Sequence, residues 1–150
     1  EKLAEGGSST VNAAVPVTEE TPQFKNISIK NVTISGAQQA VFLQGLPEMN
    51  LENIEISNLT AKADKGFSII DANGIKIHNI KLDIAAPTVF EIYNGQNLSL
   101  KNIKFKVTSS KAITINGAVS ENIELISGKD QDLSKATTIG EDVKKSAVKF

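Results

Sequence analysis

Few side chains of this 150-residue chain have the chemistry to act as a catalyst or a ligand of a metal ion. His78 is the only histidine, and there is no cysteine, so disulfides and thiolate ligands are absent. A histidine can act as a general base near neutral pH. However, His78 stands beside Asn79 at a polar position of the sequence pattern, which favours a solvated surface residue.

Paired acids are the other chemical candidates, because two carboxylates can share general acid and base roles or bind a cation. The pairs are Glu19 with Glu20, Glu141 with Asp142, and Asp130 with Asp132. All fall in expected loops and lack a second acidic cluster that would complete a cage. We therefore expect solvated acids, no metal site and no cofactor.

The charge balance is close to neutral, with 16 basic and 17 acidic side chains and a net charge of −1. This balance gives no electrostatic case for binding nucleic acid or a membrane surface. No run of 18 apolar residues exists, and EKLAEGGSST at residues 1–10 is polar, unlike a signal peptide.

A repeat organises the rest of the sequence. The template is asparagine, apolar, any, apolar, any, asparagine, apolar, and its copies start 27, 21, 23 and 25 residues apart. Irregular spacing of this size suits stacked β-coils with loops of variable length. The five copies begin at Asn26, Asn53, Gly74, Asn97 and Asn122.

Apolar residues alternate within each copy, which predicts a strand with one buried face. The parity changes after the second asparagine, as at Asn58 between Ile56 and Leu59. A straight strand cannot change parity, whereas asparagine tolerates the left-handed backbone of a bend. We expect corners at Asn31, Asn58, Asn79 and Asn102, with side chains bonded to one another along the stack.

A third strand is expected in each gap, at VFLQ (41–44), FSII (67–70), VFEI (89–92) and AITI (112–115). Asn-Gly follows three of them, at 73–74, 94–95 and 116–117. This dipeptide usually indicates a hairpin, but its recurrence once per repeat predicts another coil corner.

The predicted fold is all-β: a right-handed parallel β-helix, a solenoid of about four to five coils with a C-terminal cap. The alternative is a leucine-rich repeat, whose period overlaps this one. Its asparagine comes three residues after the last leucine, whereas Asn31 follows Ile29 by two, and no gap shows helical spacing.

Three regions are expected: a loop or linker at 1–20, β-helix coils at 21–127, and a capping coil at 128–150 with one helical turn near Leu133. A solenoid end without a cap exposes a strand edge that can pair with another chain. VNAAVPV (11–17) is expected to cover the first edge in part, leaving a tendency to associate end to end.

The run TPQFKNISIKNVTI (21–34), followed by GAQQAVFLQGLPEMNLENIEISNLTAKADKG (36–66), resembles the C-terminal coils of the polygalacturonase-like glycoside hydrolases. This is family 28, and the likeness is greatest to its bacterial pectin-degrading branch. The resemblance covers about residues 15–150. It implies a parent enzyme that hydrolyses pectic polysaccharide and a periplasmic or extracellular location.

That family uses an Asn-Thr-Asp motif, an Asp-Asp pair, Gly-His-Gly and Arg-Ile-Lys, and none of these occurs here. The chain has no arginine at all. The resemblance therefore implies no catalytic residue in this chain, which would contact pectic polysaccharide through coils upstream. The alternative is a self-contained carbohydrate-binding or adhesion β-helix with no catalytic parent.

Gln44 and Glu48 are the candidate substrate-binding residues. In the resembled family the active strip follows one strand per coil, and VFLQ aligns with the strand that carries Arg-Ile-Lys upstream. Gln44 would extend this strip and Glu48 would overhang it. With no tryptophan and Tyr93 as the single tyrosine, the sequence shows no aromatic platform for sugars.

Overall fold

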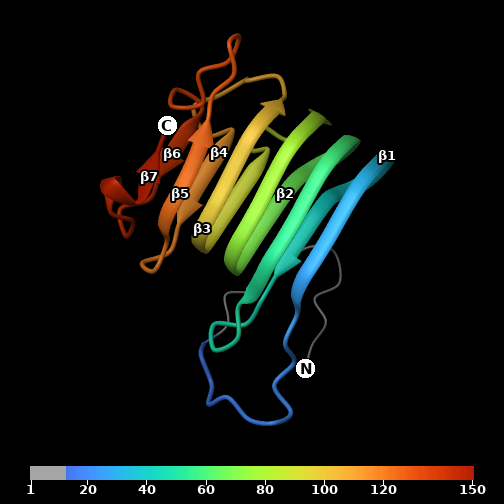
Figure 1. Cartoon of the computed structure of the whole chain (residues 1–150). Coiled ribbons are helices and arrows are strands. Elements are labelled where there is room, and N and C mark those ends of the chain that lie inside the picture. The colour runs from blue at the N-terminus through green and yellow to red at the C-terminus, as the bar shows by residue number, and fades with distance from the viewer. Residues whose placement is uncertain (1–12) are drawn as a thin grey trace.

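A computed structural model describes residues 13–150, which form a β-solenoid of about five turns (Figure 1). Every pairing between its named strands is parallel. The elements are β1 Lys25–Gln44, β2 Leu51–Ile84, β3 Phe90–Lys104, β4 Ile113–Asn116, β5 Glu121–Ile126, β6 Thr137–Ile139, the 3₁₀-helix η1 Lys145–Ala147 and β7 Val148–Lys149. The predicted parallel β-helix is confirmed. The leucine-rich repeat is wrong, because residues 13–150 contain no α-helix to back its strands.

Each full coil has three faces, and the long strands β1 and β2 bend around the corners between them. The first face contains 27–30, 54–57, 75–78, 98–101 and 123–126. The second contains 32–35, 59–62, 80–83 and 103–104. The third contains 41–44, 67–70, 90–93, 113–116 and 137–139. Within a face, equivalent residues of successive coils pair directly, as Ile27 does with Ile54.

The corner between the first two faces is an asparagine in every regular coil. Asn31, Asn58, Asn79 and Asn102 have φ values between 53° and 58°, in the left-handed region. The side-chain amide nitrogens of Asn58, Asn79 and Asn102 each donate to the asparagine side-chain oxygen of the coil before, over 3.1, 3.3 and 2.6 Å. The predicted corners and their axial ladder are confirmed.

The corner before the first face carries a second ladder. Asn53 donates to Asn26 over 2.7 Å and Asn122 donates to Asn97 over 2.6 Å. In the coil between them Gly74 makes the left-handed bend with φ 75°, and the neighbouring Asn73 supplies the amide that accepts from Asn97. This ladder is therefore interrupted between Asn53 and Asn73, and it resumes from Asn73 through Asn97 to Asn122.

The Asn-Gly pairs form coil corners and no hairpin, as expected, but they do not occupy one equivalent corner. Asn73 pairs in register with Gln96, whereas Asn94 follows the third face, one residue beyond the pairing of Tyr93 with Asn116. In the pair at 94–95 the asparagine, Asn94, has the positive φ of 52°. In the pair at 116–117 the glycine, Gly117, has the positive φ.

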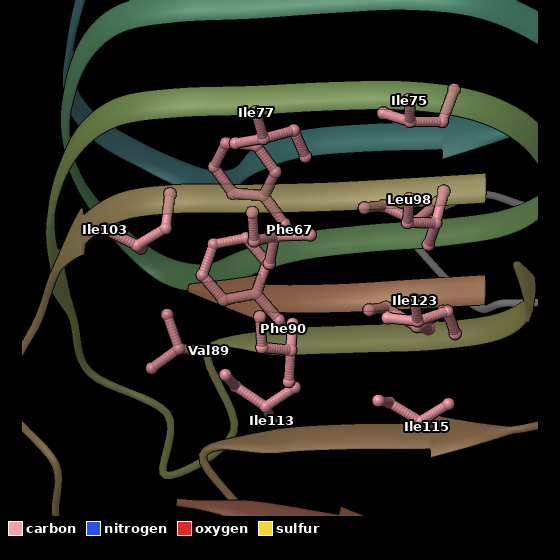
Figure 2. Packing of buried hydrophobic residues seen from close by; sticks show 14 of the residues in the cluster. Phe67, Ile75, Ile77, Val89, Phe90, Leu98, Ile103, Ile113, Ile115 and Ile123 are labelled. Carbon is pink, nitrogen blue, oxygen red and sulfur yellow. The ribbon is translucent and has the colours of Figure 1, made fainter. Parts of the chain in front are cut away.

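The core is a set of apolar columns that run along the solenoid axis (Figure 2). Ile75, Leu98 and Ile123 stack on the first face. On the third face the rings of Phe67 and Phe90 lie 4.8 Å apart between centroids. Burying one such side chain stabilises the fold by about 1.5–3 kcal/mol. The apolar columns therefore contribute a large part of the free energy that holds successive coils together.

The third-face strands lie within one residue of where the sequence predicted them. Phe67 pairs with Phe90, and Phe90 in turn pairs with Ile113. Val89 and Ala112 lie one residue before this row. Stacking of the two phenylalanine rings favours the observed register. Val89 instead donates to the carbonyl of Ala112 at the turn that precedes the strand.

The residues from 128 onward complete the last coil. β6 pairs with β4 and β7 pairs with β5, so both ends of this segment continue the stack. The helical turn expected near Leu133 is wrong in position. Leu133 is buried in a hydrogen-bonded turn that closes at Ala136, while the 3₁₀-helix η1 lies further on.

The opposite end of the solenoid is open within the described residues. Ile27 and Ile29 are 39% and 37% exposed, whereas their partners Ile54 and Ile56 are 2% and 1% exposed. Residues 1–12 of the expected N-terminal loop lie outside the described residues. Val15 and Val17 are more than half exposed, so the expected apolar cover is wrong for the part of that segment that the structure describes.

Asn58 joins two ladder bonds, so replacing it tests the corner. We expect Asn58→Ala to lower the free energy of unfolding by about 1–3 kcal/mol, from lost hydrogen bonds and a strained left-handed alanine. Asn58→Gly should avoid the backbone strain, because glycine adopts a positive φ readily, and should lose only the free energy of the hydrogen bonds. Asn122→Ala, which loses one ladder bond, should cost less. Equal and negligible shifts of the urea midpoint at Asn58 and Asn122 would contradict this.

The open end gives a second test, in the matched pair Ile29→Lys and Ile56→Lys. At the exposed Ile29 we expect a loss of about 1 kcal/mol or less, because the lysine can reach water. At the buried Ile56 the charge should prevent folding. Ile29→Lys should also lower the oligomer fraction in sedimentation velocity, because it places a charge on an open edge. An unchanged fraction at high concentration would show that association occurs elsewhere.

Candidate functional site

The third face differs from the other two in what it presents to solvent. Its outward positions carry one charged side chain, Glu91, and no lysine. The first face presents Lys30, Glu55, Lys76, Lys101 and Glu124, and the second presents Lys62, Lys81, Asp83 and Lys104. The outward residues of the third face are Phe42, Gln44, Ser68, Ile70, Glu91, Tyr93, Thr114, Asn116 and Thr138.

Gln44 lies in this outward strip, as the sequence predicted. It pairs in register with Ile70, and the row continues along the axis through Tyr93 and Asn116. Ile70 is 2% exposed, yet it is not part of the core cluster. The row crosses four coils on the outward side of the sheet, and it is covered at Ile70.

Glu48 sits at the tip of a tight turn that follows Gln44. The turn closes through two 3.0 Å backbone hydrogen bonds between Leu46 and Met49. Gly45 allows the chain to enter it, because a Cβ there would collide with the carbonyl oxygen of Asp71. The Glu48 carboxylate accepts a long 3.4 Å hydrogen bond from the backbone of Val15.

Asp71 is a buried carboxyl at the corner that ends the third face. It is 3% exposed and accepts a 3.1 Å hydrogen bond from the side-chain amide of Asn94. Burial raises the pKa of Asp71 above its usual range; the Asn94 bond opposes this, and the nearby Glu48 carboxylate adds to it. Neither Asp71 nor Glu48 is among the residues that line the four concavities described below.

A pocket of about 190 Å³, here called the Tyr93 pocket, opens on the third face. It spans three coils and is smaller than the roughly 300–1,000 Å³ sites that hold drug-sized molecules. It is therefore suited to one ring-sized unit. Its lining is Ser68, Ile70, Glu91, Ile92, Tyr93, Thr114 and Asn116.

A second pocket of about 230 Å³, here called the Lys65 pocket, adjoins the first. Both are lined by Ser68 and Glu91, so they form one shallow groove. Lys65 gives this second part a positive charge opposite in sign to Glu91. The remaining lining comes from Gln39, Gly66, Phe67, Ala86, Pro87 and Thr88.

The polar side chains of the Tyr93 pocket are available to a ligand. In the part of the chain that the structure describes, the side chains of Glu91, Tyr93, Thr114 and Asn116 make no hydrogen bond or ion pair, and neither does Ser68. The corner asparagines, in contrast, bond along their ladders. Free donors and acceptors around an aromatic ring are the features of a binding site for a polar ligand.

His78 proves to be a surface residue, as expected. Its ring nitrogen Nε2 lies 3.2 Å from Glu55 across neighbouring coils of the first face, and Lys30 lies 3.9 Å from the same carboxylate. The His78 hydrogen bond, followed by the charge of Lys30, lowers the pKa of Glu55. These groups line no pocket, so their contacts hold neighbouring coils together at the surface.

The three acidic pairs do not form a common cluster within residues 13–150. Asp142 accepts a 3.0 Å hydrogen bond from the backbone of Gly117, and Asp132 accepts one from Ser134 that lowers the pKa of Asp132. Glu19 and Glu20 are exposed in the segment before β1. Across residues 13–150 no group of three or more acids or histidines is placed to hold a metal ion.

Two larger concavities lie near the C-terminal end, at about 600 and 540 Å³. The first lies between residues 118–122 and 144–149, and the second between 102–107 and 128–131. Both are formed mainly by loops, and neither contains an aromatic ring beside a free carboxylate on a strand face. The third-face groove is the better candidate.

Sequence reasoning missed Glu91 and Tyr93. The sequence did not fix which residues of VFEI point inward, and the observed register turns both residues outward. The spacing of phenylalanines 67 and 90 was the signal that could have set the register correctly. Tyr93 was judged only as an isolated aromatic residue, although its coil neighbours supply the polar groups around it.

Comparisons of this chain with protein families, with curated proteins and with solved structures find no match. No helix within residues 13–150 is long and apolar enough to cross a membrane. The chemistry of the third face must therefore be judged from its own residues.

Asp71 gives a pH-dependent prediction. Because its pKa is raised in the folded state, ionised Asp71 destabilises the protein above the folded pKa, and this penalty disappears as the pH falls below the unfolded pKa. Asp71→Asn keeps an acceptor for Asn94 and cannot ionise. We expect the variant to be more stable than the native protein at pH 7 and equal to it at about pH 3.

Urea denaturation at both pH values measures the difference. Asp130→Asn, in an exposed loop, is the matched control and should change stability little at either pH. A loss of stability for Asp71→Asn at pH 7 would show that the ionised carboxylate is favourable at this corner.

Proposed function

We propose that this chain is the C-terminal β-helix portion of a polygalacturonase-like glycoside hydrolase that acts on pectic polysaccharide outside the cytoplasm. Its role in that enzyme is structural, and the catalytic carboxylates belong to coils stacked on β1. A periplasmic or extracellular location follows from a polymeric substrate.

The exposure of Ile27 and Ile29 carries this proposal. These side chains occupy positions that are buried in every later regular coil, and their own strand β1 has an unpaired edge within the described residues. Covering them with one more coil would bury apolar area and pair the backbone groups of that edge. The resemblance of residues 21–66 to polygalacturonase-like coils indicates what kind of coils these would be.

Inverting glycosidases need two carboxyl groups about 6.5–9.5 Å apart that face the scissile bond with room for water. The described residues do not provide such a pair in a pocket, since Glu91 is the only acid that lines the third-face groove. The arrangement is therefore consistent with catalysis elsewhere in the parent enzyme.

A second candidate is a self-contained carbohydrate-binding β-helix. The observation that favours it is the groove on the third face, with one aromatic ring and free polar groups on a rigid sheet. The two candidates differ in what the gene encodes before Glu1: acidic catalytic motifs for the hydrolase, and none for the binding protein.

The test is hydrolysis of polygalacturonate, measured as release of reducing ends. We expect the 150-residue chain to give none above a blank. The same chain produced together with its naturally encoded upstream coils should be active, and replacing the first aspartate of the upstream Asp-Asp pair with asparagine should abolish the activity. Hydrolysis by the 150-residue chain alone, or upstream coils without paired aspartates, would overturn the proposal.

A further inference from the structure

The Tyr93 pocket contains a single charged side chain. No lysine or histidine lines it, and Glu91 is its one charged group. A carboxylated ligand placed there would face a like charge with no cation to offset it, at a cost of about 1 kcal/mol at contact distance near water. An uncharged polar ligand meets no such penalty.

The groups that line the pocket match the surface of a sugar. The Tyr93 ring offers an apolar surface for the C–H face of a pyranose, and Thr114 and Asn116 offer hydroxyl and amide groups beside it. The Glu91 carboxylate has two acceptor oxygens and can receive hydrogen bonds from two adjacent hydroxyls.

We propose that the third-face groove is an accessory binding site for a neutral sugar unit of a polysaccharide, held between Tyr93 and Glu91, and that it discriminates against uronic acids. The site deepens the proposed function and rests on it, because it names which units of a pectic polymer this part of the enzyme holds.

The geometry of the stack favours a chain of sugars over a single one. Ser68, Glu91 and Thr114 repeat along the axis at equivalent positions of three coils. Coils are spaced about 4.7–4.9 Å apart, close to the length of one sugar unit in an extended polysaccharide. A polymer lying along the axis would therefore meet the same hydrogen-bonding row at each unit.

Lys65, in the adjoining pocket, could weaken the discrimination against carboxylated sugars. Lys65 can attract a carboxylate, but Glu91 lines the same pocket and opposes it. We therefore assign the neutral unit to the Tyr93 pocket alone.

The experiment titrates the full chain with two tetramers that differ only at C6, one of galactose and one of galacturonic acid. Backbone amide resonances report the position and the affinity of binding. We expect the galactose tetramer to shift the resonances of residues 91, 93, 114 and 116, and to bind about fivefold more tightly than the galacturonic acid tetramer, as one like-charge contact predicts.

Three variants assign the roles. Tyr93→Ala should weaken galactose binding about two- to tenfold, the range for loss of one stacking contact. Glu91→Lys should reverse the preference, so that the acidic tetramer binds more tightly. Lys81→Gln, on the second face, is the matched control and should leave galactose binding unchanged. The amide spectrum of each variant shows whether it is folded.

Several results would overturn the inference. They are no shift at the third face with either tetramer, equal affinity for both, or a native affinity in a folded Tyr93→Ala variant. Shifts of the same residues when protein concentration rises without sugar would instead assign this face to a second copy. Failure of the proposed function is seen separately, because upstream coils without paired aspartates would leave these titrations unchanged.

Discussion

The left-handed corner, held by asparagine, is the constraint on which the rest of the fold depends. Ten non-glycine residues have positive φ, and nine of them are asparagines. Most side chains resist this conformation. Asparagine is among the few that tolerate it, and here its amide also bonds to the next coil. One residue type therefore makes the bend and joins successive coils at the same point.

The corners also determine the surface that a ligand meets. Each bend changes the parity of the alternation, so a corner decides which residues of the following strand face the core. On the third face Phe67 and Phe90 point inward, and Glu91 and Tyr93 point outward. The groove is thus a consequence of core packing, since a shift of one residue would exchange the stacked rings for the carboxylate.

The sequence predicted the repeat, the parallel solenoid and the asparagine ladder, because these depend on local alternation and on the backbone preference of one residue type. It did not predict the register of 89–92, since Val89 and Phe90 are both apolar and either can point inward. Long-range ring stacking decides between them. Gln44 was placed correctly on the outer strip, but the pocket itself requires side chains from three coils and could not be read from any single repeat.

The ladders have a direction that bears on how the solenoid could be extended. At the first coils the side-chain amide nitrogens donate toward the preceding coil, so Asn26 and Asn31 accept from Asn53 and Asn58. Their own amide N–H groups have no partner within the described residues. A coil stacked on β1 would complete both ladders if it offered side-chain oxygens at the same two corners. Two copies that met through their β1 edges would instead bring donors against donors. This asymmetry favours extension by a coil of the same hand and register, and such a coil would lengthen the third-face groove along the same axis.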